Sequence, residues 1–176
     1  MSESYKDLFE ETVWSNGPTT VQFEAGNPPD SRLISNINAV PFTSDGRWVV
    51  IRLDNGLWEI PGGTIEIGEE PLVALRRELM EEAGASLVST RYIGAWRMHS
   101  QAEKPYRPHL PHPVTYRVVY LCEVTLESTP QLPLEGGEQV VAVEALKLED
   151  VIACFEQIDR FDLAELYRYA VSIVRQ

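Results

Sequence analysis

The feature that most constrains the fold is a run of three β-rich segments separated by two tight-turn dipeptides. The segments span residues 32–42, 47–53 and 57–60. Asp45-Gly46 and Asn55-Gly56 stand between them. Both dipeptides favour two-residue hairpin turns, because those turns need positive φ angles that glycine adopts without steric cost. We therefore expect three consecutive antiparallel strands here.

Helical and strand patterns alternate along the rest of the chain. Pro71 and Gly84 bracket a helical stretch, as a first helical position and a C-terminal cap would. Strands are expected over 87–98, 114–126 and 140–146, and helices over 70–83, 148–157 and 162–176. This pattern predicts an α/β (α+β) fold, an α/β/α sandwich in which helices cover both faces of a mixed, partly antiparallel sheet.

The first thirty residues are expected to form an N-terminal appendage to a main domain at residues 31–176. Residues 4–14 read as a short capped helix that begins at Ser4, and residues 19–25 alternate like a strand. This appendage is a candidate surface for homodimerisation.

Composition narrows the range of partners. The chain has 27 acidic and 15 basic residues and a net charge of −12, which repels polymeric nucleic acid and anionic lipid. It has no basic start followed by an apolar run and no apolar stretch of about 20 residues, so no membrane association is expected. Cys122 and Cys154 have no metal-ligand spacing and are expected to be buried and reduced, which favours a cytoplasmic location.

Three glutamates share one face of the helix expected at 70–83. At about 100° per residue, Glu78, Glu81 and Glu82 fall close together, next to an apolar stripe that includes Leu72. Three carboxylates alone are compatible with a solvated acidic surface. They are equally the hard oxygen ligands that Mg²⁺ or Mn²⁺ prefers, and bound cations would let an acidic protein hold an anionic substrate.

The residues before this helix favour the second interpretation. The run from Gly63 to Ala85 resembles the Nudix box, which reads G, five residues, E, seven residues, then R-E-U-x-E-E-x-G-U, where U is a bulky aliphatic residue. The matching positions are Gly63, Glu69, Arg77, Glu78, Leu79, Glu81, Glu82 and Gly84. Ala85 departs from the pattern only in size. The W-x-x-P-G-G sequence common before the box is present from Trp58 to Gly63.

The resemblance implies a Nudix hydrolase domain at residues 31–176. Such enzymes use Mg²⁺ or Mn²⁺ to cleave a phosphoanhydride bond in a nucleoside diphosphate linked to a moiety X, such as a nucleotide sugar or a nucleoside triphosphate. By resemblance, Glu78, Glu81 and Glu82 are catalytic metal ligands, joined by the carbonyl of Gly62. Glu69 and Arg77 would form an ion pair that braces the loop against the helix. The expected partner is a small phosphorylated molecule, in keeping with a nucleotide.

Two loops outside the box are candidates for further functional residues. The general base is either Glu78 or a loop glutamate, Glu135 or Glu138, which flank two glycines. Arg97, Tyr106 and Arg107 lie in or beside a proline-rich segment and are candidates for substrate binding, although an exposed surface loop would have the same composition.

Two other functions are compatible with such a fold. A non-catalytic Nudix-fold module could sense a nucleotide, but a pure binding role would not need all three glutamates. An isoprenoid diphosphate isomerase would use a cysteine in its site, and neither Cys122 nor Cys154 lies in a motif linked to that chemistry.

Overall fold

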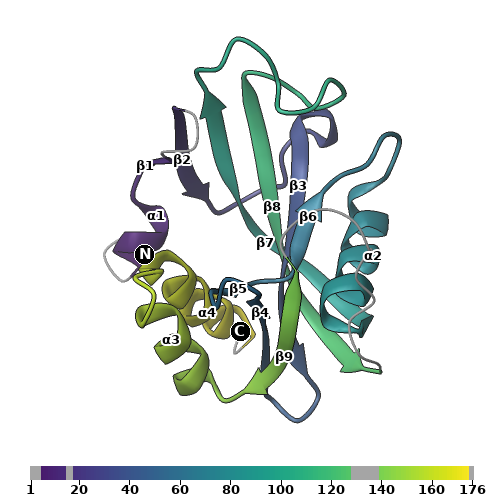
Figure 1. Ribbon diagram of the computed structural model, residues 1–176, viewed down its shortest axis with the longest axis vertical. Coiled ribbons are helices and arrows are strands. Elements are labelled where there is room, and N and C mark those ends of the chain that lie inside the picture. Colours follow the sequence, from purple (N-terminus) through teal and green to yellow (C-terminus); the bar gives the residue numbers. More distant parts are fainter. Residues whose placement is uncertain (1–4, 15–17, 128–138, 175–176) are drawn as a thin grey trace.

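The sheet of this protein lies between two layers of helices. A computed structural model describes residues 5–14, 18–127 and 139–174. Helix α2 covers one face of the sheet, and α3 and α4 cover the other (Figure 1). The described helices are α1 (Lys6–Phe9), α2 (Pro71–Ala83), α3 (Leu148–Glu156) and α4 (Phe161–Val174). The α/β/α sandwich predicted from the sequence is confirmed.

The sheet is mixed, as predicted. Its strands run in the order β1-β2-β7-β8-β3-β4-β5, while β6 pairs with β3 and β9 pairs with β4. The strands are β1 (Thr12–Trp14), β2 (Thr19–Glu24), β3 (Ile34–Thr43), β4 (Trp48–Leu53), β5 (Trp58–Glu59), β6 (Gly62–Thr64), β7 (Ala85–Ser100), β8 (Val114–Leu126) and β9 (Val140–Leu146). Among the described strands, β3 and β8 are parallel and the other pairs are antiparallel.

Local signals set the turns and the end of α2. Strands β3, β4 and β5 follow one another as antiparallel neighbours, and Gly46 and Gly56 in their turns have φ angles of 80° and 85°. Gly84 ends α2 in the left-handed conformation, with φ 59°, and its N–H donates to the carbonyls of Leu79 and Met80. Glycine at this position costs little because it has no Cβ to clash.

Two apolar layers fix α2 and α4 against opposite faces of the sheet. Leu75 and Leu79 of α2 are fully buried in one layer, and Leu163 and Tyr167 of α4 are buried in the other. Each large side chain buried in this way contributes about 1.5–3 kcal/mol of transfer free energy. Leu72, which was expected in the buried stripe of α2, is 42% exposed, so that expectation was wrong. The helix turns Leu72 away from the sheet and buries Ala74 beside Leu75.

The N-terminal segment extends the sheet. Helix α1 has only four residues, and Thr12–Trp14 forms β1, so the helix expected over 4–14 was wrong for its second half. Tertiary pairing explains the difference, because β1 finds an antiparallel partner in β2, and β2 pairs with β7. Leu8 is buried and its N–H donates to Glu165 on α4 at 2.9 Å. Homodimerisation through this segment stays a prediction.

Two smaller expectations concern the cysteines and membrane association. Cys122 is buried in β8, but Cys154 on α3 is only half-buried, so the expectation that both are buried was wrong for Cys154. Within the described residues, no helix combines the length and the apolar character needed to cross a membrane.

Candidate active site

A cavity of about 610 Å³ lies beside α2 and β6, and residues of β3, β4, β5 and β8 complete its wall. It is strongly charged. Its acidic lining residues are Glu59, Glu66, Glu78, Glu81 and Glu82, and its basic ones are Arg77, Arg107 and Arg117. The cavity therefore contains the three helix glutamates expected to act together.

Gly62 and Gly63 bring backbone unusually close to the helix carboxylates. The Gly62 N–H donates to an Oε atom of Glu82 at 2.9 Å. A Cβ atom at position 62 would overlap the Ile37 carbonyl, and one at position 63 would overlap the Glu78 carboxylate. Only glycine lets the chain pass between β3 and α2 here. Gly62 and Gly63 therefore fix the distance of Glu78 and Glu82 from the loop.

Arg77 is the centre of an ion-pair network in the cavity. It holds both carboxylate oxygens of Glu69, with Nε and Nη2 at 2.8 and 2.9 Å, and Nη1 lies 2.7 Å from Glu78 and 3.2 Å from Glu81. Glu69 also accepts the N–H of Glu66 at 2.9 Å. The bidentate contact links the loop before α2 to the helix itself, since planar guanidinium and carboxylate groups match in geometry.

Burial and charge crowding act on these carboxyl groups in different ways. Arg77 lowers the pKa of Glu69 through its hydrogen bonds. Burial raises the pKa of Glu78, which is only 8% exposed, and this outweighs the contact with Arg77. Burial raises the pKa of Glu82 to about 8 against the opposing Gly62 hydrogen bond, and the charges of Glu78 and Glu81 add to the rise. Burial thus disfavours the charged forms of both groups, and a metal cation beside them would favour those forms.

The donor set fits a hard divalent cation, although the side chains must rotate to bind one. Glu78 and Glu81 face Arg77, while Glu82 faces the Gly62 N–H. In this arrangement no three acidic, histidine or cysteine side chains of the described residues converge on one point. Carboxylate oxygens on one helix face next to an extended glycine backbone are the ligands that Mg²⁺ or Mn²⁺ takes together with substrate phosphates. A bound ion would replace the positive charge that Arg77 gives Glu78 and Glu81.

The other residues that the sequence predicted for the site do not all lie at this cavity. Arg107 lines the cavity, and its Cζ lies 5.6 Å from the ring centre of Tyr106, which is 84% exposed. His109 holds their loop beside the glycine-rich segment through a 3.2 Å contact with the Ile65 carbonyl. Arg97 pairs within the sheet on β7 and does not belong to the described lining of this cavity. Glu135 and Glu138 lie outside the described residues.

Sequence reasoning missed four residues in or beside the cavity. Asn38, Glu59 and Arg117 line it, and Arg160 lines an adjoining recess. Arg160 donates to Glu59 at 2.6 Å and to Asp162 at 3.0 and 3.2 Å. Arg117 is the one arginine of β8 and is followed directly by the apolar and aromatic residues 118–122, and this was the one signal that could have marked it.

Comparison with known proteins assigns the family. The family model described as NUDIX domain matches residues 33–169, which is most of the chain. The chain belongs to the Nudix family. The family generally uses a divalent metal, in agreement with the chemistry of the carboxylate cluster.

Individual Nudix proteins resemble this chain over shorter stretches. It is 36% identical over 75 residues to a MutT-like protein of Streptomyces ambofaciens, covering 42% of this chain and 47% of that one. It is 35% identical over 74 residues to an RNA pyrophosphohydrolase of Halorhodospira halophila, covering 41% and 40%. The chain thus matches less than half of either relative. A NUDIX hydrolase from Nitrosomonas europaea shares the fold, with a TM-score of 0.59, 15% identity, and coverage of 81% and 91%.

Proposed function

We propose that this Nudix protein is a Mg²⁺-dependent hydrolase, also served by Mn²⁺, that cleaves a phosphoanhydride bond in a nucleoside diphosphate linked to a moiety X. Nucleotide sugars, nucleoside triphosphates and related small molecules belong to this class. One observation carries the proposal: Glu78, Glu81 and Glu82 line a single cavity, and two of them have a raised pKa. The name of the Halorhodospira halophila relative, RNA pyrophosphohydrolase, supports the same reaction class.

The three glutamates and the carbonyl of Gly62 would hold the metal ion. A bound divalent cation neutralises phosphate charge and lowers the pKa of water at the site. Arg77 and Glu69 join the loop to the helix, so the Gly62 backbone and the three glutamates stay next to one another. The carboxylates that would hold the cation belong to a protein with a net charge of −12, and with the cation bound their cavity would attract an anionic substrate instead of repelling it.

The proton of the attacking water needs an acceptor from this chain. Glu78 is one candidate, because it is the most buried of the three helix glutamates. Glu135 and Glu138 are the others, and they lie outside the described residues. The pH dependence of kcat in Glu78→Gln, Glu135→Gln and Glu138→Gln identifies the base, since only its loss removes the acidic limb of the profile.

Turnover by Glu82→Gln tests the proposal. The variant should keep the fold and lose Mg²⁺-dependent hydrolysis across a panel of nucleoside diphosphate derivatives, with products identified by mass. Glu149→Gln is a matched control, because Glu149 is exposed on α3 on the opposite face of the sheet from α2. Unchanged turnover in Glu82→Gln would refute the proposal. Binding of nucleotides by the wild type without any product would favour the non-catalytic sensing module instead.

We further propose that residues 1–30 act as an appendage that supports homodimerisation. The segment adds β1 and β2 to the edge of the sheet, where a second copy could pair. Light scattering of the full chain measures this directly, and a monomer at all concentrations would refute it.

A further inference from the structure

Arg117 is a cation in the wall of the 610 Å³ cavity whose hydrogen-bond donors are unused. Among the described residues, three arginines line this cavity; Arg77 is bonded to glutamates and Arg107 is exposed. Arg117 is partly buried, and its buried Nε has no hydrogen-bond partner in the part of the chain that the structure describes. A buried donor without an acceptor is destabilising, so such a donor in a cavity wall indicates that a bound molecule supplies the acceptor.

The neighbours of Arg117 attract its charge but do not accept its hydrogen bonds. Its Cζ lies 5.3 Å from the ring centre of Trp14, and an indole is a donor without an acceptor atom. Glu59, whose charge acts on Arg117 from a distance, is bonded to Arg160 at 2.6 Å. The buried Oδ1 of Asn38 on the neighbouring strand likewise accepts no hydrogen bond from the described residues. The donors of Arg117 are therefore free for a ligand.

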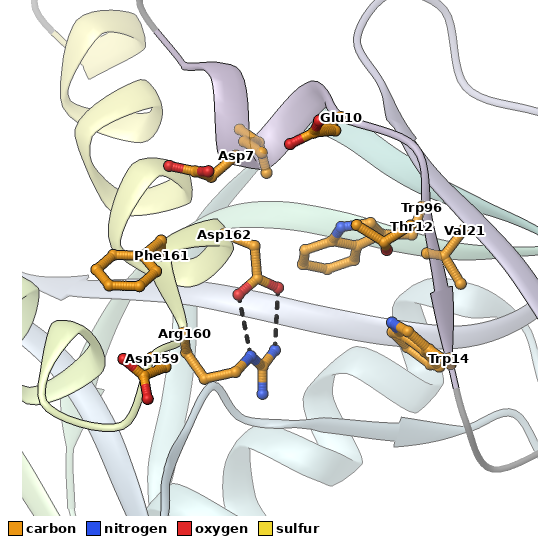
Figure 2. A pocket seen from close by; sticks show the side chains of 11 residues that line it. Asp7, Glu10, Thr12, Trp14, Val21, Trp96, Asp159, Arg160, Phe161 and Asp162 are labelled. Atoms are coloured by element: carbon orange, nitrogen blue, oxygen red, sulfur yellow. Dashed lines mark hydrogen bonds and ion pairs between the residues drawn. The ribbon is translucent and has the colours of Figure 1, made fainter.

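The space around Arg117 decides from which side a ligand can reach it. Arg117 lines the 610 Å³ cavity and the recess, and the recess holds about 20 Å³. That is less than the roughly 30 Å³ that one water molecule occupies in the liquid. Figure 2 shows the outer cavity of about 280 Å³ that adjoins the recess, with Trp14 and Trp96 on one side and the Arg160–Asp162 ion pair facing them. Acidic residues of α1 and α4 line that outer cavity and would repel an anion. A ligand of Arg117 therefore occupies the 610 Å³ cavity.

The chemistry of Arg117 favours a phosphate as its ligand. The planar guanidinium presents several N–H donors that match two oxygens of a phosphate, and partial burial strengthens the attraction between the two charges. Burial lowers the pKa of Arg117 against the opposing charge of Glu59, and a bound anion would favour the charged form. Arg77 cannot take this role without releasing its glutamates.

Arg117 also lies apart from the residues that would hold the metal ions. Thr64 of β6, Asn36 of β3 and Arg117 of β8 are aligned across three neighbouring strands. Neighbouring strands are about 4.8 Å apart, so the backbone at Arg117 is about 10 Å from the backbone of β6. A phosphate at Arg117 is therefore a further one, beyond the diphosphate at the metal ions. On its nucleoside side that diphosphate continues into an uncharged ribose, so the further phosphate belongs to moiety X.

We propose that Arg117 binds a phosphate of moiety X and thereby selects nucleoside triphosphates and longer polyphosphates over substrates in which X is an uncharged sugar. This inference rests on the proposed function, because it assumes that the diphosphate of the same molecule lies at Glu78, Glu81 and Glu82. It assigns to this chain a residue that determines specificity and that lies outside the Nudix box.

Calorimetry with two analogues that cannot be hydrolysed tests the proposal. Both contain adenosine and a methylene bridge in place of the oxygen between the first two phosphates. In one analogue X is ribose, and in the other X is a third phosphate joined through a second methylene bridge. In excess Mg²⁺ the wild type should bind the triphosphate analogue more tightly. Arg117→Met should reduce this preference about ten- to a hundredfold, as expected for the loss of hydrogen bonds between charged groups, and should leave the affinity for the ribose analogue unchanged.

Arg52→Met is the matched control. Arg52 lies on β4 with its Cζ 5.9 Å from the ring centre of Trp58, and it is exposed. Both variants lose an arginine beside an indole, but of the two arginines only Arg117 belongs to the described lining of the cavity. Arg52→Met should therefore keep the preference of the wild type. Arg117→Lys keeps the charge but loses the planar donors, so it should lose about tenfold of the preference and serves as the test if Arg117→Met does not fold.

The ratio of the two affinities separates a binding role from a structural one, because a folding defect weakens the binding of both analogues. Three results would overturn the proposal: no preference for the triphosphate analogue in the wild type, a preference that both Arg117 variants retain, or an equal loss of affinity for both analogues. The last would place Arg117 at the shared diphosphate or in the fold alone. Because neither analogue is hydrolysed, absence of catalysis would refute the proposed function and leave the ratio measurable. Hydrolysis of nucleotide sugars in preference to triphosphates would refute the role of Arg117 and leave the proposed function intact.

Discussion

The sharpest prediction concerns the stability of the metal-free protein when Glu82 loses its charge. Glu82→Gln should make that protein more stable at pH 8, although the same change removes activity. Glutamine cannot ionise, yet its side-chain oxygen can still accept the Gly62 N–H that Glu82 accepts at 2.9 Å. The substitution therefore removes a disfavoured charge and keeps the hydrogen bond.

The pKa of Glu82 fixes the sign and the pH range of the effect. The pKa rises from 4.5 to about 8 in the folded protein, mainly through burial. The folded state thus binds more protons than the unfolded state between these values, so stability falls as pH rises through that range. At about 1.4 kcal/mol per pKa unit the full shift corresponds to about 4–5 kcal/mol. Glu82 keeps partial contact with water, which reduces the expected gain to about 2 kcal/mol.

Thermal unfolding in excess chelator at pH 4.5 and pH 8 measures this difference. For a chain of this length, 2 kcal/mol corresponds to roughly 4–8 °C in Tm. We expect Glu82→Gln to melt that much higher than the wild type at pH 8 and at the same temperature at pH 4.5, while Glu149→Gln follows the wild type at both. A variant that melts no higher than the wild type at pH 8 would show that the Glu82 carboxylate is not held in a disfavoured charged state.

Two further predictions test the contacts around the carboxylates, and a third tests the packing of α4 on the opposite face of the sheet. Arg77→Lys keeps the charge but loses the bidentate contact with Glu69. Tm should fall by an amount equivalent to about 1–2 kcal/mol, and kcat should fall with it. Unchanged values of Tm and kcat would refute the bracing role of Arg77. Gly63→Ala forces the Glu78 carboxylate aside and should lower kcat about a hundredfold, whereas full activity would mean that the close approach is unimportant. Tyr167→Phe removes the 2.8 Å hydrogen bond from the Tyr167 hydroxyl to the Val49 carbonyl. The free energy of unfolding should fall by about 1–2 kcal/mol while kcat stays unchanged. A loss of kcat would connect α4 to catalysis.

Local patterns in the sequence were enough to predict how the candidate-site residues on α2 lie relative to one another. Helical periodicity placed Glu78, Glu81 and Glu82 on one face, and Pro71 and Gly84 marked the ends of the helix within a residue. The Asp-Gly and Asn-Gly turns predicted β3, β4 and β5 in the same way. These features depend on residues close together in the chain, where spacing alone decides which side chains meet.

The surroundings of Arg117 depend on contacts between residues distant in the chain, which spacing cannot reveal. Arg117 meets Trp14 only because β8, β7, β2 and β1 lie side by side in the sheet. Asn38 approaches Arg117 through the parallel pairing of β3 with β8. Thr12–Trp14 was wrongly expected to be helical. It is a strand only because it pairs with β2, and its own sequence does not show that pairing. No local pattern carries that information.

The pairing of β2 with β7 bears on where this chain can be shortened. A protein reduced to residues 33–169, the part that the family model matches, would lose β2 and leave the stretch from Ala95 to Ser100 as an unpaired strand edge. It would also uncover Trp96, which packs edge-on against Phe23. Such an edge pairs readily with other chains, so the trimmed protein should aggregate even with every Nudix-box residue in place.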